Sequence, residues 1–398
     1  DKTGYYMTAS NSTALNNIFT SISQTIGSAN IDLGSETVIK DIVTPYFTVP
    51  QNAGAIRLST AAYNGSAFGA PVAADPSVTA AIDPATRAVN VTGFDFNQNY
   101  VSTNAKADGT FGKKLIIEFD ASVEAGFLGG NQVPTNDGQS GIYAKGIMIK
   151  AFDVPTQDVE VKSITPAADD KTIYLGDSAN LQELVHQNAT FDGTNNAFVN
   201  VTYTVKDENG GTVGTYTVPA GSSSGIWEWS DAASGGTVAP EQTTTYTVTC
   251  TVSPTQSGTY GSVSKDATFT ITVNTCSLTI SKAVTGDGAN PNQTFVFDVK
   301  DSTGKLVTTI VLKDGDSKTI TGLAVGTYTV TEDTNWSWSY SIVGDNNKTA
   351  TLSGTTPSAT VDVTNHYNSH NWLTSIADVI NKWVSATEIE QIPAPETN

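Results

Sequence analysis

Cysteine and histidine are scarce in this chain of 398 residues, which has two cysteines, Cys250 and Cys276, and three histidines. So few cysteines exclude a disulfide framework as the main source of stability. The two thiols either form one bridge between neighbouring strands or remain separate and buried. No Cys and His residues stand at the spacing of a metal site, so we predict neither a metal nor a cofactor.

Charge is also sparse and mostly of one sign: charged residues make up 15% of the chain, and the net charge is −19. Phosphate binding needs concentrated cations, and no Lys/Arg cluster exists, so nucleic acid is not an expected partner. No apolar run approaches the roughly 18 residues of a transmembrane helix, and we predict no membrane segment. The 38% of hydrophobic residues argue against a disordered chain.

Thr, Ser, Asn, Gly and Val are abundant, as in strands and the turns between them. Residues 243–249 read Thr-Thr-Thr-Tyr-Thr-Val-Thr, and residues 201–206 alternate apolar and polar side chains before a turn at 207–211. Many short strands between Gly, Asp and Asn turns are typical of β-sandwiches. Because the chain is too long for one core, we predict a mainly β protein with about two to four domains in an elongated rod.

Short helices are predicted at both ends. In residues 1–30, a strand precedes apolar residues at three- and four-residue steps: Leu15, Ile18, Phe19, Ile22 and Ile26. This strand and helix resemble the closing part of a von Willebrand factor A-type domain. The Asp-x-Ser-x-Ser metal motif of that family is absent, so no ion site is carried over. Residues 369–398 combine an amphipathic helix with an extended tail, and the helix docks either on its own domain or on a neighbouring subunit.

Two further segments resemble modules of bacterial surface proteins. Residues 31–157 contain strands at 38–43 and 113–119 and a Gly-Gly turn at 129–130, and they resemble the domain that follows the A-type domain in many Gram-positive adhesins. Residues 158–275 contain a Trp-Glu-Trp strand and a late Thr-rich strand. They resemble bacterial Ig-like or PKD-like repeats, which are usually spacers.

Residues 276–368 contain three motifs in order: a first strand at 278–284, a Gly-x-Tyr-x-Val-x-Glu strand ending at Glu332, and a last strand with Thr-Asn-x-Tyr at 364–367. The whole segment resembles the B-type repeat of collagen adhesins, the Cna-B fold of pilins and adhesin stalks. In that family a Lys on the first strand bonds covalently to an Asn on the last, helped by a Glu between them.

The resemblance therefore implies an isopeptide bond between Lys282 and Asn365, with Glu332 as the catalytic acid. Burial would lower the pKa of the lysine, which is nucleophilic only when neutral. The same burial would keep Glu332 protonated, so that it donates to the amide oxygen of Asn365 while ammonia leaves. Taken singly, the three residues fit a solvated charge, a surface acid and a turn residue. Their shared motif context favours the bond.

A second bond of this kind in residues 31–157 would use Lys40, Glu118 and either Asn131 or Asn136, but nothing in the sequence shows which residues meet. We leave it unassigned.

We therefore predict a structural stalk or subunit of a bacterial cell-surface adhesin or pilus-like fibre, and not an enzyme. No secretory signal stands at the start, so this extracellular location is inferred from the domain types. Other copies or subunits of a fibre are the expected partners. The alternative is an adhesin module that binds host protein or glycan through Trp227 and Trp229, or through Trp336 and Trp338, although core burial is the commoner role of such pairs. A hydrolase is disfavoured because no catalytic signature occurs.

Overall fold

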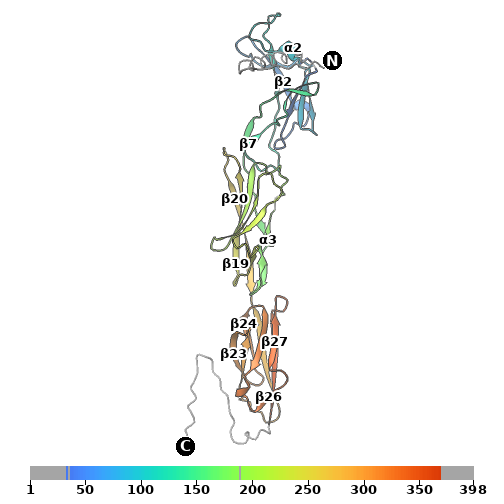
Figure 1. Cartoon of the computed structure of the whole chain (residues 1–398). Helices are drawn as coiled ribbons and strands as arrows, with labels where there is room; N and C mark the ends of the chain where they lie inside the picture. The colour runs from blue at the N-terminus through green and yellow to red at the C-terminus, as the bar shows by residue number, and fades with distance from the viewer. Residues whose placement is uncertain (1–32, 35, 188–189, 369–398) are drawn as a thin grey trace, which may run out of the picture.

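The computed structural model describes residues 33–34, 36–187 and 190–368. Figure 1 shows three β-rich units stacked end to end along one line. The predicted mainly β fold is confirmed. The α-helices of the described part are single turns, α2 (Phe96–Asn99) and α3 (Leu181–Leu184), and none is long and apolar enough to cross a membrane. The predicted terminal helices lie outside the described residues.

The first unit is a sandwich of two sheets over residues 38–151. Its larger sheet has the order β4 (Thr79–Asp83), β5 (Ala88–Thr92), β1 (Val38–Ile42), β8 (Gly141–Ala144) and β9 (Ile147–Ala151). The smaller sheet has the order β3 (Val72–Ala73), β2 (Arg57–Ala62) and β6 (Lys113–Glu118), and the 3-10 turn η1 (Ala53–Ala55) precedes β2. Ile39, Val89 and Val91 of the larger sheet pack against Leu58 and Leu115 of the smaller one.

A two-stranded ribbon, β7 (Gly130–Pro134) paired with β10 (Thr156–Val159), leads to the second unit. There the ring of Phe198 lies 5.0 Å from that of Tyr46 and 6.1 Å from that of Phe127, between centroids. These aromatic contacts carry the apolar core across the junction.

Asn131 ties the same junction with polar contacts. Its fully buried amide donates to the carbonyls of Gln256 (2.9 Å) and Tyr260 (2.8 Å) and accepts from the Tyr260 N–H (3.0 Å). A buried amide costs little when its groups are paired, so Asn131 holds the 256–260 loop in place.

The second unit is built on a six-stranded sheet. Its order is β12 (Lys171–Tyr174), β20 (Val263–Asn274), β19 (Thr244–Pro254), β15 (Val199–Lys206), β16 (Thr212–Val218) and β17 (Ile226–Trp229). Two short pairs complete the unit: β11 (Ala167–Ala168) with β14 (Val185–His186), and β13 (Ala179–Asn180) with β18 (Thr237–Val238). The core includes Leu181, Tyr203 and Phe269. Strand β12 runs parallel to β20.

The third unit is a sandwich of two four-stranded sheets. The first has the order β24 (Ser317–Leu323), β21 (Cys276–Thr285), β28 (Ser358–Tyr367) and β26 (Tyr340–Ile342). The second has the order β23 (Leu306–Leu312), β22 (Phe295–Lys300), β25 (Gly326–Glu332) and β27 (Asn347–Leu352). The 3-10 turn η2 (Thr334–Trp336) follows β25. Only Thr275 separates β20 from β21, and the N–H of Val325 donates to the carbonyl of Leu175 across this junction (2.8 Å).

Alternation explains which side chains enter the core of the third unit. Along β21, Leu278 and Ile280 point inward, and the next inward position is Lys282. Because side chains alternate between the two faces of a strand, the positions two residues apart share the inner face. Asn365 follows Val361 and Val363 at the inward positions of β28, and Glu332 follows Tyr328 and Val330 at those of β25, so polar residues stand within the apolar series.

Candidate functional site

The structure brings Lys282, Glu332 and Asn365 together inside the third unit. The amine nitrogen Nζ of Lys282 lies 2.9 Å from Oδ1 of Asn365, and Nδ2 of Asn365 lies 2.8 Å from Oε1 of Glu332. Strands β21 and β28 are parallel neighbours, with Lys282 level with Val363 and Asn365 level with Val284. Both side chains therefore point to the same inner face, where Glu332 meets them from the opposite sheet. The amine and the amide are in hydrogen-bond contact and are not covalently joined in the structure.

The site is closed to water. The exposed fraction is 2% for Lys282, 3% for Glu332 and 0% for Asn365. The Lys282 amine also donates to the carbonyl of Ala283 (2.9 Å) and lies 4.1 Å from the ring centroid of Phe295. These contacts partly replace the water that the amine loses on burial.

Burial shifts the pKa of both titratable groups. It lowers the pKa of Lys282 to about 8, although the nearby Glu332 carboxylate works in the opposite direction. It also raises the pKa of Glu332 above its ordinary value, against the lowering effect of hydrogen bonds from Ser337 and Asn365 and of the Lys282 charge. The two shifts favour moving one proton from the lysine to the glutamate, which gives a neutral amine beside a neutral acid.

The orientation of the amide differs from the sequence-based expectation. We expected Glu332 to donate to the amide oxygen, whereas Oδ1 faces Lys282 and Nδ2 donates to Glu332. This arrangement suits the charged pair, because an ammonium donates and a carboxylate accepts. A rotation of the amide by about 180° would exchange the two atoms and place Oδ1 against the acid.

Sequence reasoning missed Ser337, a fourth member of the site. Its hydroxyl donates to Oε1 of Glu332 at 2.7 Å, and its side chain is 2% exposed. Trp336 belongs to η2, and Ser337 caps that 3-10 turn. An inward serine next to a short turn leaves no periodic signal in the sequence.

Cys250 and Cys276 are buried free thiols. Cys250 lies in the core of the second unit and Cys276 in that of the third, so the structure contains no bridge between them. Burial raises the pKa of Cys250 to about 11, which keeps it a thiol at neutral pH. The expectation of two buried thiols fits this placement, and a disulfide does not.

The residues considered for a second bond do not meet. The Lys40 amine lies over the ring of Tyr143, 4.6 Å from its centroid, and Glu118 is exposed. Asn131 is engaged at the junction described above, and Asn136 donates to the carbonyl of Asp153 (3.3 Å).

The first tryptophan pair lies on one face of β17, as alternation predicts. The rings of Trp227 and Trp229 are stacked, with centroids 4.6 Å apart and planes inclined by 7°. Both are half-buried and pack against the core of the second unit. Trp229 also covers Gly214 and Gly236, where a Cβ atom would meet its ring at 2.3 and 2.4 Å. The pair therefore has a structural role in packing.

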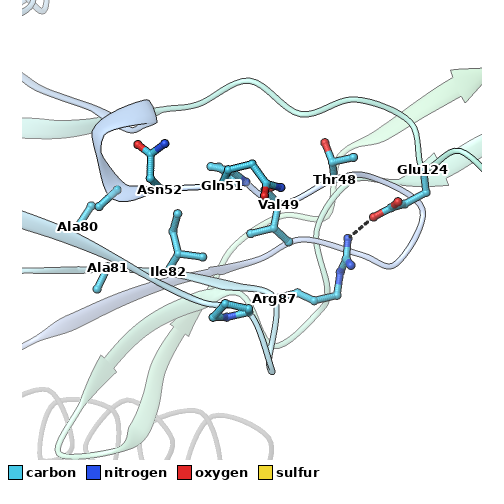
Figure 2. Close-up of a pocket in the computed structure, with 12 residues that line it drawn as sticks. Thr48, Val49, Gln51, Asn52, Ala80, Ala81, Ile82, Arg87 and Glu124 are labelled. Atoms are coloured by element: carbon cyan, nitrogen blue, oxygen red, sulfur yellow. Dashed lines mark hydrogen bonds and ion pairs between the residues drawn. The ribbon is translucent and has the colours of Figure 1, made fainter.

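The first unit has a cavity of about 640 Å³, shown in Figure 2, between the loop at 48–53 and β4. Its charged lining residues are Arg87 and Glu124, which pair at 3.4 Å. The Arg87 guanidinium also donates to the carbonyls of Val43, Thr44 and Phe47 and thereby fixes the turn after β1. Because both charges are used within the protein, neither is left to recognise a charged ligand.

A domain family described as a domain of unknown function, DUF5979, matches residues 278–368. The matched segment contains Lys282, Glu332, Ser337 and Asn365. No curated protein sequence matches the chain.

Solved structures with detectable similarity include adhesins and pilus proteins. A bacterial adhesin from Mobiluncus mulieris, which contains intramolecular disulfide, isopeptide and ester bond cross-links, has 15% identity and a TM-score of 0.28, over 43% of this chain and 85% of that chain. A group B streptococcus pilus 2b backbone protein has 18% identity and a TM-score of 0.25, over 51% and 98%. The pilus adhesin SpaC from Lactobacillus rhamnosus GG has 11% identity and a TM-score of 0.24, over 90% and 45%.

Proposed function

We propose that this chain is a load-bearing stalk or subunit of a bacterial surface adhesin or pilus-like fibre, and that its third unit closes itself with an isopeptide bond between Lys282 and Asn365. The observation that carries the proposal is the contact of an amine, a carboxamide and a carboxyl group in an interior closed to water. Three buried polar residues are costly in a sandwich core unless they serve a purpose.

The proposed reaction joins the side chains without any co-reactant. Neutral Nζ of Lys282 attacks Cγ of Asn365 while Glu332 gives its proton to Oδ1. Glu332 then takes a proton from Nζ and delivers one to Nδ2, so that the Cγ–Nδ2 bond breaks and ammonia leaves. The proton on Oδ1 is returned when the carbonyl re-forms. The Nζ–Cγ amide bond remains, and all atoms are accounted for by one lost ammonia.

Preorganisation supplies the rate. The fold holds the amine in hydrogen-bond contact with the amide, which removes the entropy cost of bringing them together. Each molecule reacts once, so the event is a maturation step and not enzymatic turnover.

The topology gives the bond a mechanical role. The chain enters the third unit at the start of β21 and leaves it at the end of β28, and these strands run parallel. Tension therefore pulls the two strands in opposite directions and shears them. A covalent link from Lys282 to Asn365 would pass the load directly between these strands, so residues 283–364 would carry none of it.

The bond would also stabilise the unit against unfolding. The closed loop spans 83 residue steps. By the loop-entropy model for cross-links, closing it in the unfolded chain contributes about 4.5 kcal/mol. One isopeptide bond would thus do what disulfides do in many secreted domains.

A rod under tension belongs outside the cell, and we place this chain at the bacterial surface with other fibre subunits as its partners. The end-to-end arrangement in Figure 1 and the tight junctions at Asn131 and Val325 suit a spacer that transmits force.

Intact-mass spectrometry of the full chain tests the proposal. We expect the wild-type protein to be lighter than its sequence by one ammonia, and Lys282→Met and Glu332→Gln to keep the full mass. Lys318→Met, an exposed lysine on β24, is the matched control and should show the wild-type loss. A wild-type chain of full mass would refute the bond.

A further inference from the structure

The carboxyl group of Glu332 is held by few contacts. Oε1 accepts hydrogen bonds from Ser337 and Asn365, whereas Oε2 is buried and has no hydrogen-bond partner. Asn365 is itself the reacting group, and its amide must rotate before the acid can face Oδ1. Among these hydrogen bonds, the one from Ser337 is therefore the one that persists while Asn365 moves.

Ser337 is in turn fixed by its backbone. Its N–H donates to the carbonyl of Thr334 (3.3 Å), and its own carbonyl accepts from the N–H of Tyr340 (2.7 Å). The preceding carbonyl, that of Trp336, accepts from the side chain of Gln293 (3.3 Å), which is itself buried. The turn that carries the hydroxyl is thus attached both to β26 and to the segment just before β22.

We propose that Ser337 is a positioning residue for isopeptide formation, which orients the Glu332 carboxyl toward the Asn365 amide through its 2.7 Å hydrogen bond. This inference rests on the proposed function of the site.

Two physical effects follow from that contact. First, a carboxyl held at one oxygen cannot turn away when the Asn365 amide rotates, so the acid stays within reach of Oδ1. Second, Ser337, Glu332 and rotated Asn365 form a chain in which each hydroxyl donates to the next oxygen. Hydrogen bonds aligned in this way polarise one another and strengthen the donation to the amide.

The pH dependence of the reaction separates this role from simple packing. The reactive form of the pair has a protonated Glu332 and an uncharged Lys282. Lys282 becomes charged at lower pH and Glu332 loses its proton at higher pH, so the rate should pass through a maximum with pH. The Ser337 hydrogen bond lowers the pKa of Glu332, and the other charges that act on the pair are Asp333 on Glu332 and Asp314 on Lys282. Removing the hydroxyl should therefore move the maximum to higher pH.

The experiment follows bond formation in freshly synthesised full chain, by acid-quenched intact mass over a range of pH. We expect Ser337→Ala to slow the loss of ammonia about tenfold, equivalent to one charge-assisted hydrogen bond, and to shift the maximum upward. Ser337→Thr, which keeps the hydroxyl, should restore both the rate and the profile. Ser341→Ala, on the exposed side of β26, controls for the loss of a serine, and Glu332→Gln gives the zero rate.

Wild-type rate and profile in Ser337→Ala would overturn the proposal, as would equal slowing of the Ala and Thr variants with no shift of the maximum. Both outcomes leave the bond itself intact. A wild-type chain that never loses ammonia would instead remove the proposed reaction and this inference with it.

Discussion

The second and third units share a parallel clamp, by which we mean the pairing of an early strand with the last strand of the unit. They differ in the side chains at this pair. In each, an early strand lies parallel to the last one: β12 beside β20, and β21 beside β28. In the second unit the inward residues at this pair are Ile173 and Ile271, both buried. In the third unit Lys282 and Asn365 stand at inward positions, in contact with each other.

The comparison indicates that the parallel clamp needs no covalent bond in order to form. Hydrogen bonding and apolar packing are sufficient to build it in the second unit. The polar residues of the third unit cost desolvation and, by our proposal, exchange a reversible clamp for an irreversible one. The difference between the units should therefore be largest under load and smaller at equilibrium.

The largest effect is expected in single-molecule pulling from the chain ends. If the proposed bond forms, the wild-type third unit should not extend between Lys282 and Asn365, while the second unit unfolds. Lys282→Met should add an unfolding step that releases roughly 280 Å of contour length, from 83 residue steps of about 3.4 Å. Identical force–extension traces for the variant and the wild type would contradict the proposed difference between the two units.

The next effect concerns equilibrium stability. Lys282→Met should lower the free energy of unfolding of the third unit by about 4.5 kcal/mol, because its unfolded chain regains the entropy of an open loop. Denaturant titration measures the change, and Lys318→Met should alter stability by less than about 0.5 kcal/mol. A loss of similar size in both variants would contradict the entropic account.

A matched pair of core truncations sharpens the comparison further. Ile271 and Ile280 are both fully buried beside the parallel clamp of their own unit. Ile271→Ala and Ile280→Ala should each cost about 3 kcal/mol at equilibrium through the cavity left behind. Only Ile271→Ala should lower an unfolding force, because the proposed bond would carry the load in the third unit. Equal weakening of both units under force would argue against covalent load transfer.

A smaller effect should appear with pH in Asn365→Ala, where Lys282 stays unreacted. Burial lowers the pKa of this lysine to about 8, below its ordinary value of 10.5, so the folded state binds fewer protons than the unfolded state between these values. The stability of the third unit should therefore rise with pH from about 8 to 10, by about 2 kcal/mol. Lys282→Met/Asn365→Ala lacks the lysine and should lack this rise. A fall over the same range in the single variant would contradict the assigned burial.

Much of the site follows from the sequence, because the alternation of side chains along a strand decides which of them point inward. Lys282 continues the series of Leu278 and Ile280, and Glu332 continues that of Tyr328 and Val330. This alternation does not set the orientation of the Asn365 amide, which depends on the protonation of Lys282 and Glu332. We predicted the opposite orientation for this amide.

Features that depend on irregular backbone or on contacts between units were not predictable. Ser337 enters the site from a 3-10 turn, and Asn131 reaches a loop more than a hundred residues away. The separation of Cys250 from Cys276 arises because the chain passes from one core to the next at Thr275. Local sequence carries no record of such long-range packing.

The most direct test of the central claim is a peptide map of the wild-type protein by tandem mass spectrometry. We expect a branched peptide in which the Lys282 side chain is joined to that of Asn365, with the loss of one ammonia and no linear form of either peptide. Recovery of both segments as separate linear peptides, with unmodified lysine and asparagine, would contradict the account.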